Sequence, residues 1–140
     1  MLTAESIMSE NVVTVYDDML VKQVAHLMLR QRVSVFPVKS RQTEEFVGIV
    51  TMTDFFQMVN SAFRAQPRNA FRERISSLKE IPVSLLMSRK MVMVTPETTL
   101  EEIVQMVLER NIHSFPVMKD KKMIGIISRH DILNAVYVYY

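Results

Sequence analysis

The chain has 140 residues, of which 49% are hydrophobic; it contains no cysteine and carries a formal net charge of +2. This length and hydrophobic content can bury the core of one domain or of two small fused modules, which excludes a disordered chain. The lack of cysteine excludes thiol catalysis and cysteine-ligated metal centres, and the small net charge argues against a dedicated nucleic-acid binder.

The N-terminal segment is acidic and polar, whereas a secretory signal peptide needs a basic start followed by an apolar run. Charges or prolines interrupt every apolar stretch before it reaches the roughly 20 residues that cross a bilayer. We therefore predict a cytoplasmic protein without a membrane span.

An internal repeat organises the chain. Ile7-Met8-Ser9 returns 79 residues later as Leu86-Met87-Ser88. The two glycines, Gly48 and Gly125, occupy equivalent positions after a loop that is two residues shorter in the second copy. Such self-similarity predicts two copies of one supersecondary unit. The predicted division is a first motif at 1–60, a basic connector at 61–80 and a second motif at 81–140.

Each copy begins with a short strand, around Val13 and Val15 or Val92 and Val94, followed by a helix. The helix is indicated by apolar residues at i, i+3, i+4, i+7 and i+8, the stripe of a helix with one buried face. The stripe comprises Val21, Val24, Ala25, Met28 and Leu29 in the first copy and Leu100, Ile103, Val104, Val107 and Leu108 in the second. Thr98 and Thr99 each precede a glutamate by three residues, the spacing of a capping box at a helix start.

Two β-rich runs and a second helix complete each copy. The runs are Val33–Val38 and Phe46–Thr51 in the first copy, and Ile112–Met118 and Met123–Ser128 in the second. We expect Asp54 and Asp131 to open the second helices, which run from Phe55 to about Phe63 and from Ile132 to about Val138. The unit is β-α-β-β-α, an α/β (α+β) fold in which the first two strands pair parallel and the last two antiparallel.

The connector region at 57–80 holds five basic side chains, Arg64, Arg68, Arg72, Arg74 and Lys79, against two acidic ones, Glu73 and Glu80. A solvated helical connector is the main interpretation, because interleaved aromatics and excess charge elsewhere are lacking. A nucleic-acid contact through this stretch stays open as an alternative.

The motif Gly-x-x-Thr/Ser-x-x-Asp occurs in both copies, ending at Asp54 and Asp131. A glycine permits close backbone approach, a helix start binds anions, and a carboxylate accepts two hydrogen bonds from a diol. Together these groups suit a ribose phosphate. The alternative is that each aspartate caps its helix and each glycine marks a strand bend.

Other repeated residues are open to two interpretations. Pro37 and Pro116 are expected at a strand edge or kink, where a freed carbonyl could face a base. Most of the twelve methionines suit core packing, but the repeat preserves Met8 and Met87 as candidates for a binding role. His26 is expected on the surface.

No catalytic or metal-binding motif is apparent. The three histidines lack the i, i+4 pairing of a zinc site, and two glycines 77 residues apart exclude nucleophile-elbow, Walker and dinucleotide-binding loops. We therefore predict that the protein is not an enzyme and binds no metal.

The sequence resembles the cystathionine-β-synthase (CBS) domain family over essentially its whole length. The likeness rests on the Met-Ser starts, the two Phe-Pro-Val strands, Gly-Ile-Val-Thr-Met-Thr-Asp and Gly-Ile-Ile-Ser-Arg-His-Asp. It implies a regulatory module of two CBS motifs packed with pseudo-twofold symmetry, which binds adenosine ligands in two clefts and commonly pairs into a homodimer. AMP, ADP, ATP and S-adenosylmethionine are the implied ligands, which makes energy sensing an expected role.

The resemblance also implies two binding sites. The first uses Met8, Asn11, Val13, Val33 and Ser34 around the base, with His113, Ile126, Ser128 and Asp131 opposite and Arg129 and His130 near the phosphate. The second uses Met87, Lys90, Val92, Ile112 and His113 near the base, with Ser34, Ile49, Thr51 and Asp54 opposite. Met52-Thr53 replaces Arg129-His130 in the second site, which predicts that it is the weaker one.

The predicted function is therefore a stand-alone module that binds an adenine nucleotide and passes its ligand state to a partner protein. One alternative is a ligand-free interaction module. The other is an accessory protein that contacts nucleic acid through its basic connector.

Overall fold

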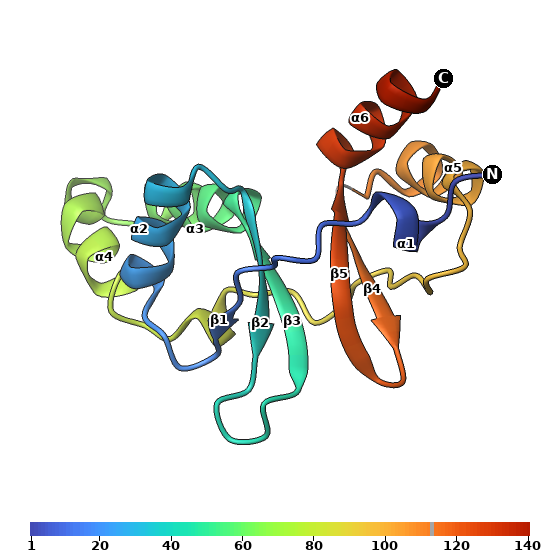
Figure 1. Ribbon diagram of the computed structural model, residues 1–140. Helices are drawn as coiled ribbons and strands as arrows, with labels where there is room; N and C mark the ends of the chain where they lie inside the picture. The colour runs from blue at the N-terminus through green and yellow to red at the C-terminus, as the bar shows by residue number, and fades with distance from the viewer. Residues whose placement is uncertain (113) are drawn as a thin grey trace. The chain divides into compact units, whose positions relative to one another are not determined.

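The computed structural model describes residues 1–112 and 114–140. The chain folds into two compact units, shown in Figure 1. Unit 1 comprises residues Met1–Val12 and Lys90–Tyr140, and unit 2 comprises Val13–Arg89. The N-terminal segment thus belongs to the unit that contains the second motif.

Unit 2 has the predicted β-α-β-β-α order. Its elements are β1 (Val15–Tyr16), α2 (Val21–Gln31), β2 (Val35–Lys39), β3 (Phe46–Thr51) and α3 (Met52–Arg64). Strand β1 pairs parallel with β2, and β2 pairs antiparallel with β3, so the predicted pairing of this copy is confirmed. Beyond α3 lie the short helix η1 (Arg68–Ala70), α4 (Phe71–Leu78) and η2 (Val83–Leu85).

Unit 1 departs from the predicted order at its first strand. Its elements are α1 (Ala4–Ile7), α5 (Leu100–Arg110), β4 (Ser114–Lys119), β5 (Lys122–Ser128) and α6 (Arg129–Tyr139). In place of the strand expected at Val92 and Val94, one parallel bridge joins Val94 to Val117. Pro96 follows two residues later and has no N–H to donate, which explains why the pairing stops.

Each unit has its own core. Phe36 is the largest fully buried side chain of one, which also contains Val15, Val24, Met28, Val38, Val50 and Val83. Phe115 is the largest fully buried side chain of the other, which also contains Ala4, Val94, Ile103, Val117 and Ile127. The predicted stripes supply these cores, with one correction: Leu29 and Leu108 are 76% and 73% exposed. The i+8 position is rotated about 80° from position i around the helix, so it lies at the edge of the stripe.

The two strand prolines do not lie at free edges. Pro37 is buried in β2, the central strand of its sheet, and pairs with Ile49. Pro116 pairs with Ile126, and its carbonyl accepts a hydrogen bond from the Val94 N–H at 2.9 Å. Of the two predicted positions, an edge or a kink, the edge is therefore excluded for Pro37. In both hairpins the pairing register shifts shortly after the proline, between Val38 and Lys39 and between Val117 and Met118. This irregularity fits the predicted kink.

The loop between β2 and β3 is tied to the strand β1. The Arg41 guanidinium lies 4.1 Å from the Tyr16 ring centre and pairs with Asp18 at 2.8 Å. The Tyr16 hydroxyl donates to the Glu44 carboxylate at 3.0 Å, and this hydrogen bond raises the pKa of Tyr16. These contacts fix one end of the hairpin in unit 2.

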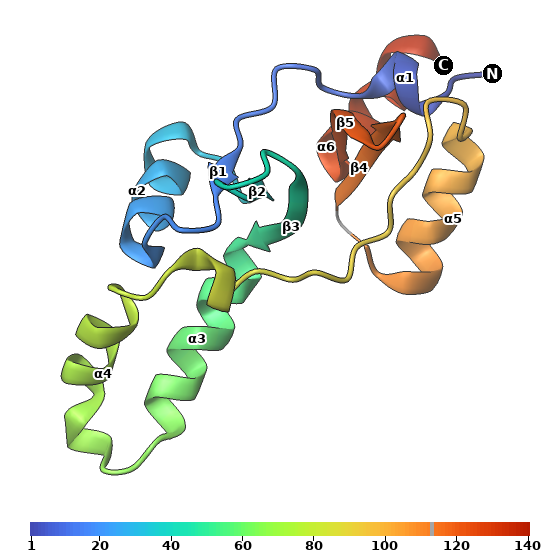
Figure 2. The same ribbon diagram turned by 90° about the horizontal axis from the view of Figure 1, so that it is seen from below.

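Helices α3 and α4 form a helical hairpin in the region predicted as a solvated connector, and Figure 2 shows them side by side. The Phe63 and Phe71 rings stack with centres 4.0 Å apart. The Arg74 guanidinium donates to the carbonyls of Ala62, Ala65 and Pro67 at 2.8 to 3.0 Å. One of the predicted basic side chains therefore holds the turn together instead of facing a partner.

Candidate functional site

Asp131 lies at the start of α6 in unit 1. Ser128 is the N-cap of this helix, and the Asp131 N–H donates to its hydroxyl at 3.2 Å. The Ser128 N–H and hydroxyl both donate to Asp131 Oδ2, at 2.8 and 3.0 Å. A third donor, the Ser9 hydroxyl, lies 3.3 Å from Asp131 Oδ1.

Asp54 has the same place at the start of α3 in unit 2. The Thr51 N–H and hydroxyl donate to Asp54 Oδ2 at 2.7 and 3.1 Å, and the Asp54 N–H donates to Thr51 at 3.3 Å. Both motifs thus build a capping box at the strand-to-helix turn.

This geometry corrects the predicted helix starts. The helices begin at Met52 and Arg129, three residues before the predicted starts, because Thr51 and Ser128 cap them and the aspartates occupy the third helical position. The capping interpretation of Asp54 and Asp131 is confirmed. Only Oδ2 is used for it, however, so in each motif the second carboxylate oxygen can still accept from a diol.

The Met-Ser segments pair across the repeat. Ser9 from the start of the chain forms an antiparallel bridge with Ile126 in β5, with hydrogen bonds of 2.9 and 3.1 Å. Ser88 forms the equivalent bridge with Ile49 in β3, with hydrogen bonds of 2.9 and 2.8 Å. Each Met-Ser segment is therefore held on the strand that leads to the aspartate of the other motif.

This pairing explains the two glycines. A Cβ at Gly48 would lie 2.8 Å from the Ser88 carbonyl oxygen, and one at Gly125 would lie 2.5 Å from Met8 Sδ. Neither glycine has a positive φ. The close approach anticipated at these glycines is therefore made by the chain's own Met-Ser segment.

The predicted site residues divide between the two units. Unit 1 contains Met8, Asn11, Lys90, Val92, Ile112, Ile126, Ser128, Arg129, His130 and Asp131, and unit 2 contains Val13, Val33, Ser34, Ile49, Thr51, Asp54 and Met87. The predicted role of His113 lies outside the described residues. Ser9 was missed because nothing local in the sequence shows that it meets Asp131, 122 residues away.

The first turn of α6 carries the predicted phosphate-side residues. Arg129 and His130 occupy its first two positions, and both are exposed. The matching positions of α3 hold Met52 and Thr53, which carry no charge. The anion-favouring N-terminus of each helix is thus reinforced by basic side chains in unit 1 only.

Three further sequence predictions concern His26, metal binding and membrane spans. His26 is exposed, as predicted. Across residues 1–112 and 114–140, no group of three or more histidine and acidic side chains is placed to hold a metal. No helix in that part of the chain is both long and apolar enough to span a membrane.

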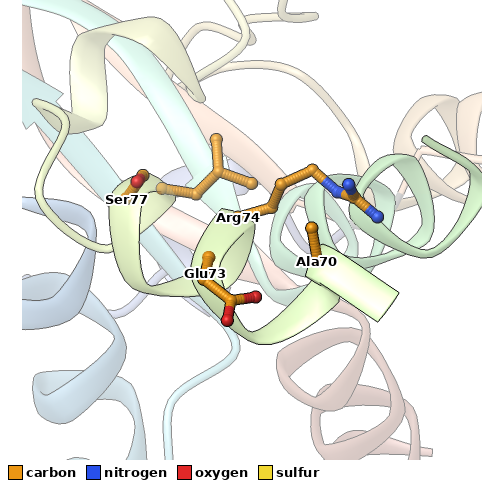
Figure 3. Close-up of a pocket in the computed structure, with 5 residues that line it drawn as sticks. Ala70, Glu73, Arg74 and Ser77 are labelled. Atoms are coloured by element: carbon orange, nitrogen blue, oxygen red, sulfur yellow. The ribbon is translucent and has the colours of Figure 1, made fainter. Parts of the chain in front are cut away.

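A hollow of about 330 Å³ lies beside α4 in unit 2, lined by Ala70, Glu73, Arg74, Ser77 and Leu78. Figure 3 shows Glu73 and Arg74 extending from the helix in different directions. None of its lining residues belongs to the predicted binding sites. Because the Arg74 guanidinium is occupied by three backbone carbonyls, the hollow offers little to an anionic ligand.

Comparison with known proteins adds a family assignment to this geometry. Residues 4–61 and 78–138 match the sequence model of the CBS domain family. The chain is 28% identical over 99 residues to the mitochondrial CBS domain-containing protein CBSX3 of Arabidopsis thaliana, a match covering 71% of this chain and 43% of that protein. It is 25% identical over 135 residues to a homoserine O-acetyltransferase of Methanococcus vannielii, covering 96% of this chain and 25% of the enzyme. The chain thus spans less than half the length of these two relatives.

The fold also matches solved structures. The structure of CBSX2 in complex with AMP superposes with a TM-score of 0.78 and 24% identity, covering 98% of this chain and 97% of that one. This likeness shows the fold of a CBS pair. It agrees with the two repeated motifs described above.

Proposed function

Because the chain belongs to the CBS domain family and carries two CBS motifs, we propose that it is a regulatory module that binds an adenosine nucleotide. The observation that carries the proposal is the strand-to-helix turn at Asp131. There, one carboxylate oxygen caps the helix while the other is directed to a hydroxyl donor, and two basic side chains share the same helical turn. This combination suits a ribose and its phosphate.

The ligand class is AMP, ADP, ATP or S-adenosylmethionine. CBSX2 has been crystallised with AMP, which supports an adenosine ligand for a chain of the same fold. The two residue sets predicted for the base and the ribose, including Val33 and Ile112, remain part of this proposal. The site containing Asp131 is proposed as the tighter one, and the chain is proposed to signal its ligand state to a partner protein without catalysing a reaction.

A thermal-shift screen tests this function. We expect the melting temperature to rise with at least one of AMP, ADP, ATP and S-adenosylmethionine, because a ligand that binds only the folded state stabilises it. At 100 times its dissociation constant the gain is about 2.7 kcal/mol. NAD, which also contains adenosine, is screened beside these four compounds. No shift with any adenosine compound would favour a ligand-free interaction module instead.

We also propose that the module forms a homodimer. Helix α6 exposes large apolar side chains at helical spacing: Leu133 is 68% exposed and Tyr137 is 86% exposed, with Val136 and Tyr140 beside them. Apolar surface of this kind favours symmetric self-association.

Light scattering of the purified chain should give the mass of a dimer, and Leu133→Glu together with Tyr137→Glu should yield the monomer. The exposed Leu108→Glu on α5 is the matched control for adding charge to an apolar surface. A wild-type chain that stays monomeric over a hundredfold range of concentration would contradict the proposal.

A further inference from the structure

The helical hairpin of α3 and α4 concentrates positive charge in a short segment. Residues 62–77 contain four arginines and one glutamate, whereas the whole chain has a net charge of only +2. This segment lies between the two stretches that match the CBS family, so it stands outside the repeated motifs. A local cluster of arginines is the electrostatic footprint of a surface that binds a polyanion.

Three of these arginines are available to a partner. Arg64, Arg68 and Arg72 are exposed, and none of them has an ion pair or a side-chain hydrogen bond with another described residue. Arg68 and Arg72 lie four residues apart in the helical stretch formed by η1 and α4, so their side chains are neighbours. Figure 2 shows the turn of the hairpin at the end away from the strands of unit 2. The three guanidinium groups can therefore contact phosphates there.

The same end of the hairpin presents an aromatic ring. Phe63 directly precedes Arg64 and Phe71 directly precedes Arg72, so the expectation that this basic stretch lacks interleaved aromatics is wrong. The two phenylalanine rings stack with their planes 5° apart. Phe71 covers one face of the Phe63 ring, yet Phe63 is 50% exposed, so its exposed surface lies on the other face and the edges. A planar base can extend this stack.

Arg74 holds the turn in place. Its guanidinium donates to the carbonyls of Ala62, Ala65 and Pro67, which lie at and beyond the C-terminal end of α3. The C-terminal end of a helix carries partial negative charge, and this pairing reduces the repulsion of a phosphate beside Arg64. The ring and the exposed arginines are thus placed before a ligand binds, which limits the entropy lost on binding.

We infer that the turn of the α3–α4 hairpin binds single-stranded nucleic acid, with a base stacked on Phe63 and phosphates at Arg64, Arg68 and Arg72. The open ring favours this ligand over an acidic protein segment, because a carboxylate pairs with arginine but is repelled by the negative face of an aromatic ring. The inference is independent of the proposed adenosine site at Asp131, which belongs to unit 1.

Fluorescence anisotropy with short fluorescein-labelled oligouridylate and oligothymidylate tests the inference for RNA and for DNA. The chain should bind at low salt, and the logarithm of the binding constant should fall with the logarithm of the salt concentration with a slope of about −2, as expected for three phosphates on a single strand. Replacing Arg64, Arg68 and Arg72 together by glutamine should abolish this salt-dependent binding.

A matched control removes the same charge elsewhere. Lys119, Lys121 and Lys122 are exposed around the turn between β4 and β5 in unit 1. Replacing these three lysines together by glutamine should leave the affinity and the salt slope close to those of wild type.

Variants of Phe63 separate stacking from charge. Phe63→Leu keeps an apolar contact with Phe71 but removes the ring, so it should weaken binding about 5- to 150-fold and leave the salt slope unchanged. The chain contains no tryptophan, so Phe63→Trp introduces a single indole at the turn. This variant should keep the affinity, and its fluorescence should be quenched when a base stacks on the indole. Melting curves verify that each variant is folded.

Four results would overturn the inference. The first is that neither oligonucleotide binds at low salt. The second is an equal loss of binding in the lysine control, which would show diffuse attraction. The third is wild-type affinity in Phe63→Leu without quenching in Phe63→Trp, which would show that no base contacts the ring. The fourth is competition by oligoglutamate of the same length as strong as that by oligouridylate, which would assign the surface to an acidic protein.

Discussion

Replacing Asp131 by alanine should weaken adenosine phosphate binding at the tighter site by about 10- to 150-fold. Charge-assisted hydrogen bonds contribute about 1.5–3 kcal/mol, and the carboxylate is the one charged acceptor that the Asp131 turn offers to a ribose among the described residues. Asp54→Ala should leave the tightest binding phase nearly intact. The difference follows from the first helical turns, where Arg129 and His130 stand in place of Met52 and Thr53.

Both aspartates also cap helices, so folding has to be controlled. Losing a cap costs about 1 kcal/mol, which lowers the melting temperature but leaves a folded chain able to bind. Asp131→Asn keeps an acceptor oxygen for the cap and removes the charge, so it should recover stability without recovering full affinity. Calorimetry would refute the ranking of the two sites if Asp54→Ala abolished the tight phase while Asp131→Ala preserved it.

Gly48→Ala should destabilise the protein by about 2–3 kcal/mol, the upper part of the range for overpacking. Its Cβ would lie 2.8 Å from the Ser88 carbonyl oxygen, a backbone atom. That carbonyl accepts the Ile49 N–H at 2.9 Å, so it cannot retreat without weakening the bridge. Gly125→Ala should cost less, about 1–2 kcal/mol, because its closest contact is the flexible side chain of Met8 at 2.5 Å and its nearest backbone atom, the Ser9 carbonyl oxygen, lies farther away at 3.0 Å.

A second substitution tests why Gly48→Ala and Gly125→Ala should differ in stability. Denaturant unfolding should show that Met8→Ala restores part of the stability lost in Gly125→Ala, because it removes the atom nearest to the new Cβ. Met87→Ala should give a smaller recovery in Gly48→Ala, because the contact with the Ser88 carbonyl oxygen at 2.8 Å remains when the Met87 sulfur at 2.9 Å is removed. Equal losses in the two glycine variants, or a larger rescue in Gly48→Ala than in Gly125→Ala, would show that the Met-Ser segments are not held as described.

The repeat and its hydrophobic periods were enough to predict the element order of the first motif. They placed Val24, Met28 and Ile103 in the cores correctly, since the buried face of a helix follows directly from the spacing. They could not predict that the strand expected at Val94 is reduced to a single bridge. That outcome depends on backbone hydrogen bonds to a distant strand, which Pro96 cannot continue. Nor could they predict that Ser9 pairs with Ile126, because contacts between distant segments leave no local pattern.

For the Thr/Ser-x-x-Asp motif, the sequence alone could not decide between a structural and a binding role. Thr-x-x-Asp and Ser-x-x-Asp have the spacing of a capping box and also carry the hydroxyl and carboxylate of a ribose phosphate site. From the sequence the two interpretations compete for Asp54 and Asp131. In the structure the cap uses Oδ2 of each aspartate, which leaves Oδ1 for the proposed diol, so a helix cap and a diol acceptor are compatible.

A crystal structure grown with saturating AMP tests the central proposal most directly. It should show the ribose hydroxyls within hydrogen-bonding distance of the Asp131 carboxylate, with the phosphate at the first turn of α6. AMP bound elsewhere, such as in the hollow beside α4, or no bound nucleotide at all, would contradict the account.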